Sequence, residues 1–127
     1  MSGNVTLAVQ RTRLYDALVA CDIGTVDKYA RKDPIPPATM IVDPRIDFAD
    51  NSILGQVEWS IWMLASRQAP AATGDALDVN LPKVLLSLSH GLGMGYVLRR
   101  VENVVRTIEG YPLPGYTIIG AAPLANC

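Results

Sequence analysis

A glycine-rich segment, SHGLGMGY at residues 89–96, is the part of the sequence that looks most like a ligand-binding motif. Its three glycines follow the only histidine of the chain, His90. Loops that cradle phosphate leave a strand and enter a helix, because the free N–H groups of the helix N-terminus then meet the anion. Here the pattern predicts the reverse, a helix that ends near Leu88 and a strand that begins at Tyr96, and no lysine follows within the segment. We therefore interpret the glycines as the close of a helix, with His90 near the negative end of its dipole.

Two other groups of residues could support chemistry. Cys21 has only His90 as a candidate base, and neither lies in a recognisable nucleophile motif, so we expect Cys21 to be a small buried residue at a helix end. Asp43, Asp47 and Asp50 could bind a cation, but their spacing differs from that of an EF-hand loop, which favours a solvated loop. We expect no catalytic residue, no metal site and no cofactor, and hence no enzyme.

The composition is typical of one folded domain, 1–127. Half of the 127 residues are apolar, and the formal net charge is −1 with a pI near 5.7. A dedicated nucleic-acid-binding protein normally carries a basic patch and a high pI, so this balance argues against one. The two cysteines have no metal-like or CxxC spacing, which favours free thiols. The N-terminus has no apolar core of the signal-peptide type, and no apolar run approaches the ~20 residues that span a bilayer, so we expect a protein made and kept inside a cell.

The elements that position these residues follow from periodicity and from the prolines and glycines. Residues 45–55 read as a turn-rich connection or the tip of a long hairpin, 67–75 as a loop and 111–115 as a turn. The pattern predicts helices at 4–20 and 80–89, the second capped by Asn80 with Pro82 in its first turn, and strands at 39–43, 56–66, 96–110 and 116–124. Short connections between the strands predict an α+β domain, a mostly antiparallel β-sheet with two main helices packed on it.

The strand expected at 56–66 has the strongest alternation. Its odd-numbered residues are apolar, and the alternation places Trp59 and Trp62 on opposite faces, one in the core and the other at an edge or interface. In the strand expected at 96–110, simple alternation places three valines on one side: Val97, Val101 and Val105.

Three segments define the layout of the whole chain. After an N-terminal helix come the proline-containing approach DPIPPATMIVDPRIDF, the strand VEWSIWMLASR and, beyond an alanine-rich loop and a helix, the closing RRVENVVRTIEGYPLPGYTIIGAAPLA. Over nearly all of residues 7–124 this layout resembles the tail terminator proteins of long-tailed bacteriophages. The GLGMG bend and Pro82 depart from the family layout, which leaves the length of the second helix open.

The resemblance implies a structural virion protein. Tail terminators form a homo-oligomeric ring, usually a hexamer, that caps the tail tube protein, stops its polymerisation and joins the tail to the head connector or stopper protein. The resemblance implies that genome DNA passes through the lumen without specific binding, that no membrane is involved, and that the protein is found in the virion tail or neck and in the host cytoplasm during assembly. It implies no catalytic residue.

On this hypothesis the useful residues are interface residues. Phe48 and Ile53 would be exposed in a monomer if the connection 43–55 is polar and open, so we predict that it reaches a neighbouring subunit or the tube. The same two residues could instead fold back on the core. The interface candidates are Arg45, Asp47, Phe48, Asp50 and Ile53 in this connection, and Arg99, Arg100 and Glu102, which could form exposed or intersubunit ion pairs.

Other functions fit the same sequence. The closest alternative is another phage neck component, a head-completion or stopper protein. A small cellular ligand-binding or enzymatic α+β domain would need convergent polar groups, for instance around Cys21, His90 and Tyr96. A cellular oligomerisation module is a third alternative.

Overall fold

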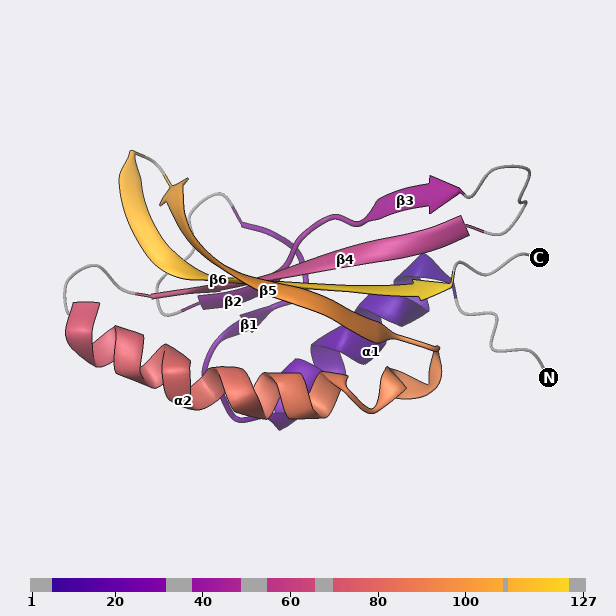
Figure 1. Cartoon of the computed structure of the whole chain (residues 1–127), viewed down its shortest axis with the longest axis horizontal. Coiled ribbons are helices and arrows are strands. Elements are labelled where there is room, and N and C mark those ends of the chain that lie inside the picture. The colour runs from indigo at the N-terminus through magenta and orange to yellow at the C-terminus, as the bar shows by residue number, and fades with distance from the viewer. Residues whose placement is uncertain (1–5, 32–37, 49–54, 66–69, 109, 124–127) are drawn as a thin grey trace.

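The chain folds as an α+β domain, as the sequence predicts. The structure, a computed structural model, describes residues 6–31, 38–48, 55–65, 70–108 and 110–123. In chain order the elements are α1 (Leu7–Ala20), β1 (Val26–Asp27), β2 (Ala38–Ile41), β3 (Arg45–Phe48), β4 (Gly55–Leu64), α2 (Pro70–Leu88), the short 3-10 helix η1 (Gly91–Gly93), β5 (Val97–Ile108) and β6 (Tyr111–Pro123). The strands form one six-stranded sheet, and both helices lie on the same side of it (Figure 1).

The sheet is antiparallel except at one edge. Its order is β1-β2-β4-β6-β5, and only β1 and β2 pair in parallel. β2 and β3 follow one another along the same side of β4: β2 pairs with Ile61–Leu64 and β3 with Gly55–Glu58. The β5–β6 hairpin is longer than β4, so that its closed end has no third strand beside it and curves away from the sheet (Figure 1).

The main core lies between the sheet and the two helices. The odd-numbered side chains of β4 point into it, and Trp59, its largest member, is fully buried. Trp62 lies on the opposite face, half-buried beside a small second cluster of Met40, Leu64 and Leu113. The alternation expected for 56–66, with its two tryptophans on opposite faces, is confirmed.

The glycine-rich segment closes α2, as its sequence predicts. Gly91, Gly93 and Gly95 all have positive φ, between 68° and 78°, a conformation that favours glycine. Arg13 of α1 holds the segment in place, because its Nη1 donates to the Leu92 carbonyl at 3.3 Å and to the Gly93 carbonyl at 2.6 Å. The segment therefore sets the angle at which the chain leaves α2 and enters β5.

Helix α1 begins later than expected, and helix α2 begins earlier. α1 starts at Leu7 rather than at residue 4, and its cap is Thr6, whose Oγ1 accepts from the Val9 amide at 3.3 Å. α2 starts at Pro70, ten residues before the expected Asn80 cap, and contains Pro82 in its interior. Proline suits the first helical position, and the alanines that follow it favour a helix over the loop expected at 67–75.

Two connections expected from the sequence are strands instead. Residues 45–48 are not a loop: they form β3, because they pair with β4 directly after β2 ends. The hairpin turns at Gly110, with φ of 84°, and not at 111–115, which belongs to β6. Pro112 and Pro114 are tolerated in β6 because their nitrogens face the side on which β4 lies, and β4 ends at Leu64. The Pro114 carbonyl still accepts a hydrogen bond from the Ala65 amide at 2.8 Å.

Tyr96 fills a space that glycine leaves in the core. A side chain at Gly120 would overlap the Tyr96 phenol, so β6 can accommodate the ring only with glycine at that position. Tyr96 is 3% exposed, and its hydroxyl has no hydrogen-bond partner among the described residues. Burial raises the pKa of Tyr96 well above its ordinary value. The buried hydroxyl therefore lowers the free energy of unfolding, whereas the packing of the ring in the core raises it.

We predict that Tyr96→Phe stabilises the fold by about 1 kcal/mol, because it removes a buried hydroxyl without a partner. The unfolded chain ionises this tyrosine near pH 10, before the folded protein does, so the free energy of unfolding of the wild type falls above about pH 10 and the gap to the variant widens there. Urea unfolding at about pH 7 and about pH 10.5 measures both effects. A variant less stable than wild type by about 1 kcal/mol at neutral pH would contradict this account.

Candidate subunit interface

The structure places the predicted interface residues on two opposite edges of the sheet. Those from the connection lie on β3, and those from the later group lie on β5, so one chain does not bring the two groups together. On β3 they are Arg45, Asp47 and Phe48, and on β5 they are Arg99, Arg100 and Glu102. Asp50 and Ile53 lie outside the described residues.

The β3 edge carries an exposed ion pair on the sheet face opposite the helices, which we call the open face. Arg45 Nε lies 3.3 Å from an Asp47 carboxylate oxygen, and both side chains are exposed. Ile46, between them, points to the helix side and is 38% exposed. An exposed pair of this kind contributes little to the stability of the monomer. The edge therefore offers two charges and one apolar side chain to a partner.

The β5 edge repeats this arrangement. Arg100 Nε lies 3.3 Å from Glu102 Oε2, again on the open face, and Val101 between them is 36% exposed. The pairing with β6 shifts by one residue between Leu98 and Arg100, so Arg99 is the extra residue of a bulge. Because of this shift, Val97 lies on the face opposite Val101, and the expectation that all three valines share one side is wrong.

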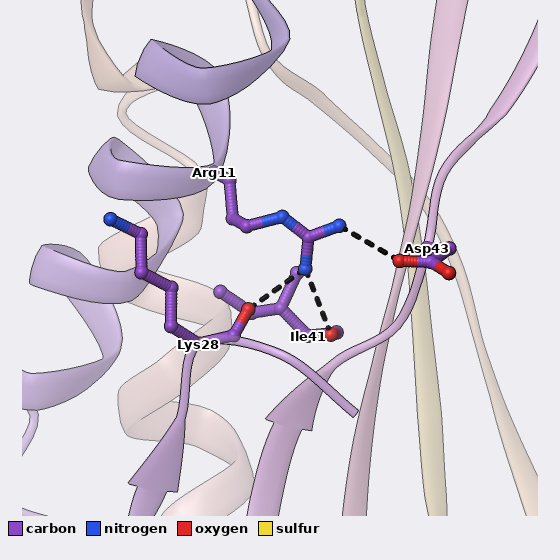
Figure 2. A network of polar contacts seen from close by, with 4 residues as sticks. All are labelled: Arg11, Lys28, Ile41 and Asp43. Carbon is purple, nitrogen blue, oxygen red and sulfur yellow. Dashed lines mark hydrogen bonds and ion pairs between the residues drawn. The ribbon is translucent and has the colours of Figure 1, made fainter. Parts of the chain in front are cut away.

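A buried arginine on α1 fixes the place where β2 ends and β3 begins (Figure 2). Arg11 is 7% exposed, and its Nη1 donates to the carbonyls of Lys28 and Ile41 at 2.8 and 3.2 Å. Its Nη2 donates to Asp43 Oδ1 at 3.1 Å, in the bend between the two strands. The guanidinium also lies 4.4 Å from the ring centroid of Tyr29. Helix α1 thereby holds the chain at the start of the β3 edge.

The neighbouring Gln10 ties the same helix to the centre of the sheet. Its Oε1 accepts from Trp59 Nε1 at 2.8 Å, and its Nε2 donates to the Pro123 carbonyl at 2.8 Å. Both of these buried polar groups are thus used in structural hydrogen bonds that join α1 to β4 and β6.

Side chains of the hairpin fix the β5 edge. Arg106 stacks over the Trp62 ring, 3.9 Å from its centroid, and donates to Thr117 Oγ1 at 2.7 Å. Tyr116 donates its hydroxyl to Asp78 Oδ1 of α2 at 2.7 Å. This hydrogen bond, with some burial, raises the pKa of Tyr116, so that the hydroxyl stays a donor. The hairpin is therefore attached to the helix side through Tyr116 and to the open face through Arg106.

Cys21, one of the residues singled out for chemistry, has structural contacts. Cys21 lies at the end of α1, as expected, half-buried, with its Sγ 3.2 Å from the Ala17 carbonyl and 3.7 Å from the Lys83 carbonyl of α2. Across the described part of the chain, no group of three or more histidine, cysteine or acidic side chains is placed to hold a metal ion. None of the helices in the described ranges is long and apolar enough to cross a membrane.

Comparison with known proteins returned no match, either among protein-family models or among curated proteins.

The sequence interpretation missed the apolar member of each edge, Ile46 and Val101. Ile46 lies in the stretch RIDF, whose polar–apolar alternation is itself a strand signal. Val101 was expected in a strand, but its exposure depends on that strand lying at the edge of the sheet, which no local pattern reveals.

We predict that Arg11→Lys lowers the free energy of unfolding by about 3 kcal/mol. Lysine cannot reproduce the fork of donors, and a buried carbonyl left without a partner costs ~1–3 kcal/mol. The matched control is Asp43→Asn, whose side chain is 89% exposed and whose loss should cost less than ~1 kcal/mol. Urea unfolding of both variants measures the difference, and equal small losses would show that the arginine does not hold this bend.

Proposed function

We propose that the chain is a tail terminator, which caps the tail tube of a long-tailed bacteriophage as a ring of about six copies. The observation that carries the proposal is that β3 and β5, on opposite sides of the sheet, have no outer neighbour among the described strands; the short β1, beyond β2, is a third such strand. A subunit with a different open edge on each side can join its copies by a heterologous contact, which closes into a ring if the rotation allows. The order of helix, proline-bearing approach and long closing hairpin supports the same class.

The distribution of charge on the open face supports a channel for DNA. One arginine of each edge has a carboxylate at 3.3 Å, Asp47 beside Arg45 and Glu102 beside Arg100. A face with alternating signs has no continuous basic track, so it would not retain the phosphate backbone through counterion release. In the proposed ring the open face lines the lumen, and α1 and α2 lie outside. Genome DNA then passes without specific binding, and no catalytic residue is required.

The long hairpin supplies a surface for the partners above and below the ring. It extends past the end of β4 (Figure 1), and Val105, near its tip, is 63% exposed. An exposed apolar side chain on a projecting element is suited to contact with another protein. In this proposal the tail tube protein binds at one end of the ring and the head connector or stopper protein at the other, which places the chain in the virion neck and, during assembly, in the host cytoplasm.

We predict that the purified protein forms closed rings of about six subunits at high concentration. Native mass spectrometry over a range of concentrations gives the number of copies, and negative-stain images of the same sample show whether the particle has a central hole. A compact dimer that persists at every concentration would contradict the proposal.

The second arm of the test adds the protein to tail tube protein from the same phage while the tubes polymerise. A tail terminator should bind one end of each tube and shorten the tubes in proportion to its concentration. Unchanged tubes, together with binding to DNA-filled heads, would favour a head-completion protein instead.

A further inference from the structure

The open edges formed by β3 and β5 differ in length, and the two strands run in opposite directions. The outer side of β2 is covered by β1, whose Val26 lies opposite Thr39, whereas β3 and β5 have no outer partner among the described strands. β3 and β6 are both antiparallel to β4 and so run in the same direction. Since β5 is antiparallel to β6, β5 runs antiparallel to β3. Copies arranged around an axis along the strands would therefore bring β3 of one copy antiparallel to β5 of the next.

Two hydrogen bonds show which backbone groups of β3 face outward. The Ala65 amide donates to the Pro114 carbonyl of β6, and the Val42 amide donates to the Ser60 carbonyl. Backbone groups of successive residues in an antiparallel strand point to opposite sides. The backbone groups of odd-numbered residues of β4 therefore hydrogen-bond to β6, and those of even-numbered residues hydrogen-bond to β2 and β3. Glu58 lies opposite Arg45. Arg45 and Asp47 therefore bond to β4, and the N–H and C=O groups of Ile46 face outward.

The same alternation fixes the outward groups of β5. Ile61 lies opposite Ile118, so Ile118 bonds to β4 and Ile119 to β5, where it faces Arg100. Arg100 and Glu102 therefore use their backbone groups toward β6. The backbone groups of Val101, and of every second residue after it, face outward and are free to bond to another strand.

We propose that β3 of one copy pairs with β5 of the next copy, with Ile46 opposite the partner's Val101. This inference rests on the proposed function for the closure of the ring, and it names the surface that joins the subunits. In this register Arg45 lies opposite the partner's Glu102 and Asp47 opposite the partner's Arg100, both on the open face. Each of the two close, non-hydrogen-bonded pairs then joins opposite charges, and Ile46 covers Val101 on the helix side.

Charge selects this register over the next two along β5 that satisfy the same backbone alternation. With Ile46 opposite the partner's Asn103, Asp47 would lie opposite the partner's Glu102. With Ile46 opposite the partner's Val105, Arg45 would lie opposite the partner's Arg106. Like charges directly opposite each other are unfavourable, so only the first register has two attractive pairs and no repulsive one.

The pairing also has natural ends. On β5 the bulge at Arg99 interrupts the ladder just beyond the partner of Asp47. On the β3 side Pro44, which has no N–H to donate, precedes Arg45. The contact is therefore a short ladder centred on Ile46, and beyond it the partner's β5 must diverge from the sheet, because β1 covers the outer side of β2.

A pair of cysteines tests the register directly. In a background of Cys21→Ser and Cys127→Ser, Asp47→Cys with Arg100→Cys should form intersubunit disulfides, because non-hydrogen-bonded pairs have Cα atoms about 4.5 Å apart. The two positions lie on opposite edges of one chain, so oxidation should give a ladder of linked subunits on a denaturing gel. Asp47→Cys with Glu102→Cys is the matched control, which reports the shifted register and should link poorly.

A charge exchange tests the energy of the contact. Arg45→Glu alone and Glu102→Arg alone should each weaken assembly by at least about tenfold in dissociation constant, and the double variant should restore it. Within each chain the double variant still places a glutamate beside Asp47 and an arginine beside Arg100, and both of these like-charge pairs are unfavourable. Restored assembly can therefore come only from the contact between subunits. Circular dichroism of dilute samples confirms that each variant is folded.

The outcomes separate this inference from the proposed function. Rings that assemble regardless of the charge exchange, or that link through the control pair, would overturn the pairing and leave the ring function standing. Linked, charge-dependent open filaments would uphold the pairing and contradict the tail terminator. A protein that stays monomeric at every concentration, or a two-fold dimer that links Val101→Cys to itself, would overturn the pairing.

Discussion

The structure depends on a charged group that the fold has to bury, the guanidinium of Arg11. It lies against the Tyr29 ring and donates to two backbone carbonyls and to Asp43, so its position fixes α1, the end of β2 and the bend before β3 at once. An arginine at this depth is tolerated only when its donors are satisfied, since a buried charge without partners costs several kcal/mol. The bend, which also contains Pro44, separates β2 from β3 where both strands pair with β4.

The second constraint is the strict alternation of backbone groups across the sheet. Once β4 is held in the centre, every neighbouring strand has one set of N–H and C=O groups used and one set turned outward. Two hydrogen bonds, from the Val42 amide to the Ser60 carbonyl within β4 and from the Ala65 amide just after it to the Pro114 carbonyl, fix that alternation for the sheet. The edges of the monomer therefore have a definite chemistry, in which charges, apolar side chains and free backbone groups recur in a fixed order. The proposed edge pairing uses these groups and requires no dedicated interface domain.

Part of this organisation can be predicted from the sequence. The central strand around Trp59, the α+β class and the closure of α2 by glycines follow from alternation and from local glycine chemistry. The early start of α2 at Pro70 was missed because 67–75 was expected to be a loop. β3 was missed because it is short and lies between Pro44 and a polar stretch at 50–52, and its strand conformation comes from pairing with β4. The bulge at Arg99 leaves no signal in a single sequence.

The candidate site was predictable to the same degree. Arg45, Asp47, Arg100 and Glu102 could be chosen by charge alone, but their grouping into two opposite edges required the sheet order.

The most direct measurement of the edge pairing is residue-resolved amide hydrogen exchange on dilute and assembled wild-type protein. The account predicts that assembly protects the amide of Val101, while the amide of Val105, which faces the same way beyond the contact, continues to exchange quickly. Unchanged exchange at Val101 in the assembled protein would contradict it.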